Sequence, residues 1–472
     1  MKSITMKLFK LTLLCMISLL FAEASFAHDI RVRLSNTGKY SINSSGNMTL
    51  TDGANKSHSI GKSTTLSVSG KTVISGKSKF SLPVTIKSSS PIGHNNNRYR
   101  GTLRVTSNSE LINVLDIEDY LRGVLKAEAN PTWPIEYLKV QAIVSRTFAM
   151  RESLSAKSRG YDVTDTTSSQ VYRGMSAESP RTDQAVRETN GKVLAYGNEL
   201  AFTPFHSDSG GATANNRDVW GKDLPYLQAI KEPIAYQSPN SFWEVRISPS
   251  ELGTALSKVN SSVGVVKDIK VVDTDIHGRA VHLRITGSAS TAVIKASTFR
   301  TAVGPNKLKS TFLVISGTNV SKQTPYPSES ENRQTSKIEM NMNESLTPKE
   351  DALLTQLFID GAFTNEEMME ILMKPETRKE YLYKAIVRGA MPPQDAKKPA
   401  TNSTKTASQP ISSGASIPFS GGYFIFQGKG WGHGVGMSQY GAMNLAKSGW
   451  NAEKILTHYF PGTKIKTAAT RK

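Results

Sequence analysis

The chain has 472 residues, 38 % of them hydrophobic, so two or three domains with ordinary cores are expected. Its formal charge of +19 is typical of proteins that bind nucleic acid. However, three lysines precede an apolar run over 11–21 and a small-residue stretch ending at Ala27. This order predicts a secretory signal peptide over 1–27. We therefore expect an exported protein, in the periplasm or at the cell wall, that contacts anionic envelope polymers and not nucleic acid.

Cys15 is the single cysteine and lies inside the expected signal peptide. The exported chain would then have no thiol, which excludes disulfides and thiolate-bound metals. His206 and His433 are candidate zinc ligands by residue type, but no third and fourth ligand accompanies them at a recognisable spacing. We expect neither a metal nor another cofactor. No second apolar run is long enough to span a bilayer.

Residues 28–115 form a β-rich region in the sequence pattern. Ile30, Val32 and Leu34 alternate with polar residues, and 80–86 and 103–105 repeat this period of two. Gly, Asn and Ser separate these runs, as they do in turns. The pattern predicts several short antiparallel strands that lead into the first helix.

Two helices are expected next, at 116–130 and 134–150. Asp116 is a good N-cap for the first helix, which must end before Pro131 because proline pushes its predecessor out of the helical region. Pro134 suits the first position of the second helix. Apolar residues line both sides of the second helix, so it should be buried nearly all round. The two helices should form a central buried pair.

Three charged residues lie on these helices where apolar residues are expected. Glu128 falls on the apolar stripe of the first helix, and Lys139 and Arg146 project from one side of the second. Buried cations need anionic partners or a polar cleft. We interpret the pattern as a cleft in which Glu128 is partly desolvated and the two cations orient a negative or strongly polar group. Alternatively, Glu128 pairs with Lys126 or Arg122, and the two cations reach solvent.

The region 116–317 continues with a mixture of strands and helices, and 318–416 differs from it in composition. The flanks of 318–416 are linker-like, while 347–388 has helical periodicity. We expect an insertion that is partly disordered and partly made of short helices. The predicted fold class is α+β, with short antiparallel strands around the buried helix pair.

A glycine-rich segment, GKGWGHGVGMSQYG, begins at Gly428 within the last region, 417–472. Glycine occupies every second position as far as Gly436, between an expected strand and a helix expected from Ser438. A flexible linker is the alternative, but a linker does not normally place Trp, His, Val and Met in the gaps. We interpret the segment as a binding loop whose missing Cβ atoms let a ligand approach the backbone.

Several segments, in this order, resemble the SpoIID/LytB family. They are DYLRGVLKAE with Trp133 and Pro134, LKVQAIVSRTFA, GYDVTDTTSSQVY, FHSDSGGAT with VWG and PYLQAI, FRTAVG, and GKGWGHGVGMSQYGAMNLA with ILTHYFPGTKI. The resemblance covers roughly 30–315 and 419–466. It makes 28–115, 116–317 and 417–472 parts of one SpoIID-like domain and leaves 318–416 unmatched.

The resemblance implies a peptidoglycan lytic transglycosylase that cleaves MurNAc-GlcNAc strands, stripped of peptides, to 1,6-anhydro-MurNAc ends. It implies one catalytic acid and base, Glu128, whose pKa should be raised by the apolar stripe around it. The residues that it places in the same cleft to bind substrate are Lys139, Arg146, His206, His433, Ser438 and Gln439. The two cations would contact substrate or hold the second helix in register. The cysteines that hold zinc in some members are absent, so no metal is carried over.

Three other activities have to be weighed. Hydrolysis would need a second carboxylate, for which Asp162 and Asp165 are candidates. A serine hydrolase is disfavoured, because His206, Asp208 and Ser209 are too close in sequence for a relay and no G-x-S-x-G is present. The remaining alternative is a non-catalytic wall-binding module that stimulates an N-acetylmuramoyl-L-alanine amidase.

Overall fold

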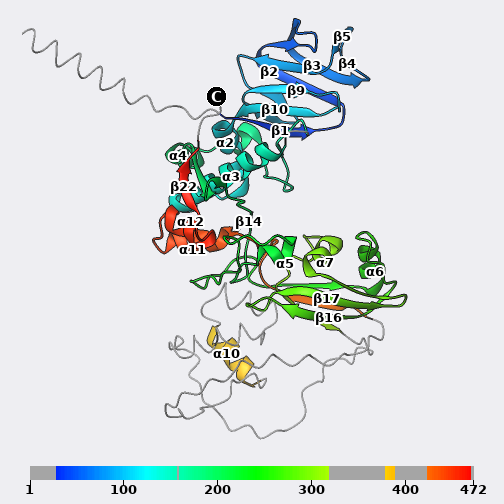
Figure 1. The fold of residues 1–472 in the computed structure, drawn as a ribbon, viewed down its shortest axis with the longest axis vertical. Coiled ribbons are helices and arrows are strands. Elements are labelled where there is room, and N and C mark those ends of the chain that lie inside the picture. Colours follow the sequence, from blue (N-terminus) through cyan, green and yellow to red (C-terminus); the bar gives the residue numbers. More distant parts are fainter. Residues whose placement is uncertain (1–27, 157–158, 318–353, 355–377, 388–421, 469–472) are drawn as a thin grey trace, which may run out of the picture. The chain divides into compact units, whose positions relative to one another are not determined.

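The computed structural model describes residues 28–156, 159–317, 354, 378–387 and 422–468 (Figure 1). Helices accompany strands in several sheets, which confirms the α+β prediction. The chain divides into two compact units, Met1–Ser321 with Ser416–Lys472, and Lys322–Ala415. None of the described helices has the length and hydropathy that a bilayer crossing requires.

In the second unit the structure describes α10 (Arg378–Val387), which lies within the stretch predicted to be helical. The linker-like flanks of 318–416 and the expected signal peptide lie outside the described residues. The export and insertion predictions therefore stay predictions.

The largest sheet of the first unit has eleven strands and is built mainly from residues that precede the helix pair. Its path is β11-β1-β10-β9-β6-β2-β3-β4-β5, with β7 beside β2 and β8 beside β7. The strands are β1 (Asp29–Ser35), β2 (Lys39–Thr51), β3 (Ser57–Ser69), β4 (Thr72–Ser75), β5 (Ser78–Ser81), β6 (Val84–Ser88), β7 (Ile92–His94), β8 (Asn97–Tyr99), β9 (Thr102–Val105), β10 (Leu111–Asp116) and β11 (Val163–Thr164).

Burial alternates along these strands, so the sheet has one apolar and one polar face. In β2, Tyr40, Ile42, Met48 and Leu50 are buried, whereas every second residue from Lys39 to Thr49 is exposed. The apolar face belongs to a core cluster that also takes in the two helices after β10. The alternation predicted from the sequence is confirmed, and the sheet forms a platform for the helix pair.

The helix pair consists of α2 (Ile117–Glu128) and α3 (Ile135–Ser155). Asp116 caps α2 by accepting a hydrogen bond from the Glu118 N–H at 2.8 Å, as predicted. Pro134 has an extended conformation and is the N-cap residue of α3, so the helix begins one residue later than predicted, at Ile135. Helix α3 packs against α2, α4, α11, α12 and β12, which explains why it is apolar all round.

Several short elements follow the helix pair in this unit. The 3₁₀ turn η1 (Gly174–Ala177) and α4 (Pro180–Glu188) lie against α2, and α4 begins at the Ser179 cap. Parallel pairing joins β14 (Phe205–His206) to β21 (Met437–Ser438) and brings the glycine-rich segment to the HSDSGGAT segment. The others are β12 (Lys192–Tyr196), β13 (Glu199–Leu200), α5 (Asn216–Trp220), α11 (Gln439–Lys447), α12 (Ala452–Tyr459) and β22 (Lys464–Thr467).

A second core cluster lies between two three-stranded sheets and two helices. Strand β20 pairs with β19 in a register that sets Phe424 opposite Gly317. The chain thus leaves for the Lys322–Ala415 unit from one strand and returns on the neighbouring one. The elements are β15 (Trp243–Ile247), α6 (Pro249–Ser257), β16 (Val266–Thr274), β17 (Ala280–Gly287), β18 (Thr291–Lys295), α7 (Ala296–Val303), β19 (Leu313–Gly317) and β20 (Phe424–Gly428).

Candidate active site

Glu128 is the last residue of α2, and it is half-buried. Its Oε1 atom accepts a hydrogen bond from the backbone N–H of Val171 at 2.6 Å. Burial raises the pKa of Glu128, while the Val171 N–H and the charge of Arg173 act in the opposite direction. A carboxyl group with a raised pKa can keep a proton near neutral pH and pass it to a leaving oxygen.

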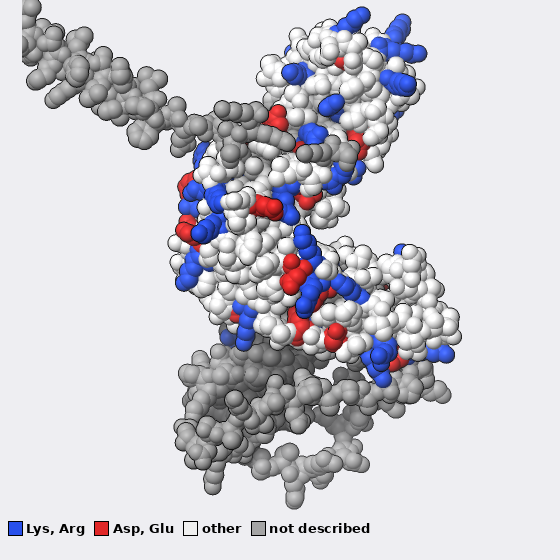
Figure 2. All heavy atoms as spheres, in the orientation of Figure 1, with Lys and Arg blue, Asp and Glu red and all other residues white. Residues whose placement is uncertain are grey.

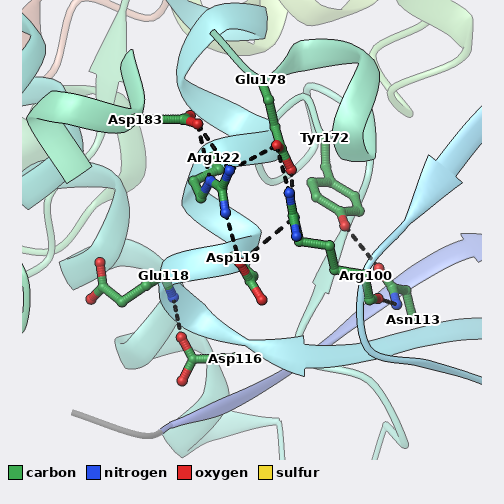
Figure 3. A network of polar contacts seen from close by, with 9 residues as sticks. All are labelled: Arg100, Asn113, Asp116, Glu118, Asp119, Arg122, Tyr172, Glu178 and Asp183. Atoms are coloured by element: carbon green, nitrogen blue, oxygen red, sulfur yellow. Dashed lines mark hydrogen bonds and ion pairs between the residues drawn. The ribbon is translucent and has the colours of Figure 1, made fainter. Parts of the chain in front are cut away.

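The two cations that could have neutralised Glu128 on its own helix have other partners. Arg122 donates to Asp183 and Glu178, each at 3.0 Å, and to Asp119 at 3.3 Å (Figure 3). The Lys126 ammonium donates to the carbonyl of Ser176 at 3.4 Å. The alternative in which Glu128 pairs with one of them is therefore wrong for this structure.

The end of the glycine-rich segment contacts the helix that carries Glu128. Gln439, the first residue of α11, donates from Nε2 to the Glu128 carbonyl at 3.0 Å and to Gln141 Oε1 at 3.4 Å. Tyr440 packs on the Trp133 ring, with centroids 5.2 Å apart. The structure thus brings Gln439 to Glu128, as the resemblance implied.

Two tyrosines lie near the acid, and each donates a hydrogen bond to a side-chain amide. Tyr120 donates to Gln170 Oε1 and Tyr137 to Gln141 Oε1, each at 3.0 Å. The charge of Glu128 contributes to raising the pKa of both phenols, after burial, so both lie near the carboxylate. Gln170 Nε2 is buried and has no hydrogen-bond partner among the described residues. It is a donor that the sequence pattern did not single out.

Arg146 and Lys139 hold structural ion pairs. The fully buried Arg146 guanidinium makes a bidentate pair with Glu118 at 2.6 and 2.7 Å and donates to the Lys192 carbonyl at 3.0 Å. Lys139 pairs with Glu136 at 2.9 Å and Glu188 at 2.7 Å. Of the two roles left open for these cations, the structure favours holding α3 in register, because Arg146 has no exposed atom to offer a substrate.

His206 and His433 lie next to each other, with ring centroids 5.3 Å apart and ring planes tilted by 60°. His433 Nδ1 accepts from the Val435 N–H at 3.1 Å, so its Nε2 donates to the Phe205 carbonyl at 3.0 Å. Burial lowers the pKa of His433 to about 4 and the pKa of His206 well below its usual value. Both rings are neutral near pH 7, and they hydrogen-bond to the backbone carbonyls of Val435 and Phe205 instead of the Glu128 helix.

The glycines of the loop serve packing within the protein. Positive φ, between 71° and 135°, is found at Gly430, Gly432, Gly434 and Gly436. This backbone conformation is by itself a reason for glycine at these positions. A Cβ on Gly432 would strike the His206 side chain, and Cβ atoms on the others would approach the backbone or side chains of the 204–214 and 279 region. The missing Cβ atoms make room for the protein's own chain, which corrects the interpretation that they make room for a ligand.

Comparison with known proteins identifies the region around Glu128. The SpoIID family model, described as Stage II sporulation protein, matches residues 106–196. This stretch is similar to the SpoIID domain. It contains Glu128, Lys139 and Arg146, whereas the two histidines and the glycine-rich loop lie beyond the matched residues.

Three relatives extend the SpoIID match. An uncharacterized protein of Brachyspira hyodysenteriae is 32 % identical over 207 residues, which is 42 % of this chain and 53 % of that protein. The amidase enhancer of Bacillus subtilis is 27 % identical over 357 residues, 73 % of this chain and 40 % of the relative. The stage II sporulation protein D of the same organism is 34 % identical over 149 residues, 28 % and 43 % of the two chains. The chain spans about half or less of each relative.

A buried polar network of residues outside the SpoIID-matched stretch was missed in the sequence. Glu232 accepts hydrogen bonds from Tyr459 at 2.7 Å and Ser209 at 2.9 Å. The Ser438 hydroxyl caps α11 by accepting from the Gly441 N–H at 3.1 Å, and it also accepts from the Ser209 N–H at 3.2 Å. Ser438 is therefore buried and organises the loop. A lone glutamate in PYLQAIKEP carries no local signal that would have identified this network.

The burial of Glu232 predicts that the free energy of unfolding of the protein depends on pH. Burial raises the pKa of Glu232 from 4.5 to about 7. The folded state holds this proton more tightly than the unfolded state. The stability that protonated Glu232 contributes is therefore complete below about pH 4.5 and is lost as pH rises through about 7, and the free energy of unfolding falls by roughly 3 kcal/mol. Urea unfolding at several pH values should show this loss, and Glu232→Gln should remove it. An unchanged pH dependence in Glu232→Gln would contradict the assignment.

The described residues contain no group of three or more His, Cys, Asp or Glu side chains placed to hold a metal ion. His206 Nε2 has no partner among them, but its neighbour His433 uses both ring nitrogens for backbone hydrogen bonds. The expectation that the protein needs no metal and no cofactor stays a prediction.

Proposed function

We propose that the protein acts on the cell wall as a peptidoglycan lytic transglycosylase, with Glu128 as its acid and base. A cell-wall role is supported by the SpoIID domain and by the relative named amidase enhancer. The single observation that carries the enzymatic proposal is the state of Glu128, which is half-buried, has a raised pKa and is unpaired with Lys126 or Arg122.

One carboxyl group suffices for this reaction. Protonated Glu128 would donate its proton to the glycosidic oxygen between MurNAc and GlcNAc as the bond to the anomeric carbon breaks. The resulting carboxylate would then take the proton of the MurNAc 6-hydroxyl as this oxygen attacks the same carbon. The products are a 1,6-anhydro-MurNAc end and a free GlcNAc hydroxyl, with no water consumed, and Glu128 is protonated again.

A hydrolytic route would require a second carboxylate beside Glu128. Asp162 is 3 % exposed and makes a bidentate pair with Arg31, so it is poorly suited to activate water. Asp165 remains a candidate, because burial raises its pKa and its nearest cation, Arg173, is 3.9 Å away. The two routes differ in product: hydrolysis leaves a reducing end.

A second candidate function is stimulation of a cell-wall amidase without turnover. It is favoured by the match to the amidase enhancer, which covers 73 % of this chain and so extends well beyond the SpoIID domain. On this proposal the partners would be peptidoglycan and an N-acetylmuramoyl-L-alanine amidase. We also propose that the protein works outside the cytoplasmic membrane, on the strength of the signal-like residues 1–27.

One assay separates these functions. Peptide-stripped glycan strands are incubated with the full chain, and the products are analysed by mass spectrometry. Anhydro-MurNAc ends are the expected result. Reducing ends would show that the protein cleaves the glycan by hydrolysis instead. No cleavage, combined with faster release of peptides by an added amidase from intact peptidoglycan, would establish the enhancer function instead. A chain with Glu128→Gln serves as the matched control.

A further inference from the structure

The outer face of the large N-terminal sheet is a basic surface that the proposed reaction does not use. Between Lys39 and Arg104 the sequence has ten Lys and Arg residues and a single acidic residue, Asp52, for a net charge of +9. Asp52 is occupied within its own turn, where its Oδ1 accepts from the N–H groups of Ala54 and Lys56. This segment thus supplies about half of the chain's formal charge of +19.

Strand register places four of these cations on the same side of the sheet. Lys39 and Lys79 stand in one cross-strand row, in which each residue pairs with the next through β3 and β4. Lys87 stands opposite Thr49 of β2, and Arg104 stands opposite the residue two before Lys87. Residues opposite each other in a ladder point to the same face. We call Lys39, Lys79, Lys87 and Arg104 the basic face.

The basic face is open to a partner. All four side chains are exposed, and none of them takes part in a salt bridge among the described residues. The positions between them in β2 and β3 are exposed and carry hydroxyl or amide groups: Ser41, Asn43, Thr49, Ser59, Ser63 and Thr65. In Figure 2 the lobe formed by these strands shows Lys and Arg side chains spread over a mostly uncharged surface, with few acids.

The chemistry of this face selects the kind of partner. Spaced ammonium and guanidinium groups with hydroxyl and amide donors between them match a chain of phosphates, each with several acceptor oxygens. A surface that inserts into a bilayer normally presents large apolar side chains. The exposed large hydrophobic residues among the described residues all lie beyond Arg104, so the sheet has no such anchor. A flexible hydrophilic polyanion therefore fits better than a lipid surface.

We propose that the basic face binds a phosphodiester-linked polymer of the cell envelope. The inference that the partner is a chain of phosphates comes from the cations and hydroxyl groups of the sheet. The inference that this chain belongs to the cell envelope rests on the proposed cell-wall function. Such binding would hold the protein along the wall while Glu128, on another element, meets the glycan.

The test uses the full chain and poly(glycerol phosphate) as the probe, with binding measured by calorimetry at several NaCl concentrations. The variant Lys39→Gln/Lys79→Gln/Lys87→Gln/Arg104→Gln should bind about tenfold more weakly or worse, and its slope of log K against log salt should fall by up to about 3. The control Lys258→Gln/Lys267→Gln/Arg284→Gln/Lys447→Gln removes the same charge from exposed positions elsewhere. It should lose less than about threefold.

Three outcomes would overturn the proposal. The first is equal weakening of both variants, which would mean that only net charge matters. The second is no binding of the unmodified chain to the polymer at low salt. The third is binding to phosphatidylglycerol vesicles without binding to the polymer, which would assign the face to a membrane. The probe contains no MurNAc-GlcNAc bond, so failure of the transglycosylase assay leaves this result unaffected.

Discussion

Glu128→Gln is expected to lower the rate of anhydro-MurNAc formation by roughly 10³-fold, because a positioned general acid typically contributes between 10² and 10⁴. Glutamine keeps the shape of the side chain, and its oxygen can still accept the Val171 N–H. It has no proton to give to the leaving oxygen. Product release from stripped glycan strands, followed by mass spectrometry, measures the effect.

The loss of activity should not come from unfolding. Because the pKa of Glu128 is raised, its ionised form is less favourable in the folded than in the unfolded state, so a neutral glutamine should leave stability above that pKa equal or higher. In the unmodified chain, activity should fall as pH rises through the raised pKa, since the acid must be protonated. Glu152→Gln, on α3 in an exposed pair with Arg159, is the control and should keep full activity. If Glu128→Gln kept full activity, another residue would have to be the general acid.

Arg146→Met is expected to lower the free energy of unfolding by about 3 to 5 kcal/mol, the usual cost of leaving one partner of a buried ion pair alone. The variant would leave Glu118 unpaired with only 13 % of its side chain exposed, and would remove the hydrogen bond from Arg146 to the Lys192 carbonyl. Urea unfolding of the full chain, followed by the circular dichroism of its helices, measures the change.

Lys139→Met is the matched control for this experiment. Lys139 is 24 % exposed and its two carboxylate partners are more exposed still, so solvent screens both pairs and about 1 kcal/mol or less is expected. In the double variant Glu118→Gln/Arg146→Met part of the stability should return, because no buried charge is left unpaired. A loss below 1 kcal/mol for Arg146→Met would mean that apolar packing alone holds the two helices.

The elements around the acid could be predicted because their signals are local. Asp116 at the start of α2 and proline after its end bound the helix in the sequence as they do in the structure, and the position of Glu128 follows from helical periodicity. The pairing of Arg146 with Glu118 could not be read in this way. It depends on how two helices turn toward each other, which sequence spacing within either helix leaves open.

The role of the glycine-rich loop also depends on contacts with a distant part of the chain, which local sequence patterns do not reveal. Its alternation was correctly recognised as unlike a linker, but the reason for it lies in the 204–214 segment, more than two hundred residues earlier in the chain, against which the glycines pack. Glu232 carries no local signal at all, since its importance arises from burial beside Ser209 and Tyr459. Residues whose role depends on distant partners are the ones that pattern reasoning missed.

The hydrogen bond from Gln439 to the Glu128 carbonyl joins residues 311 positions apart. During synthesis Glu128 emerges first, and the glutamine that steadies its helix end follows 311 residues later. Contacts this remote in sequence form late. A chain that ends before Gln439 would therefore carry Glu128 without this contact, and the proposed glycan cleavage would require synthesis past that residue.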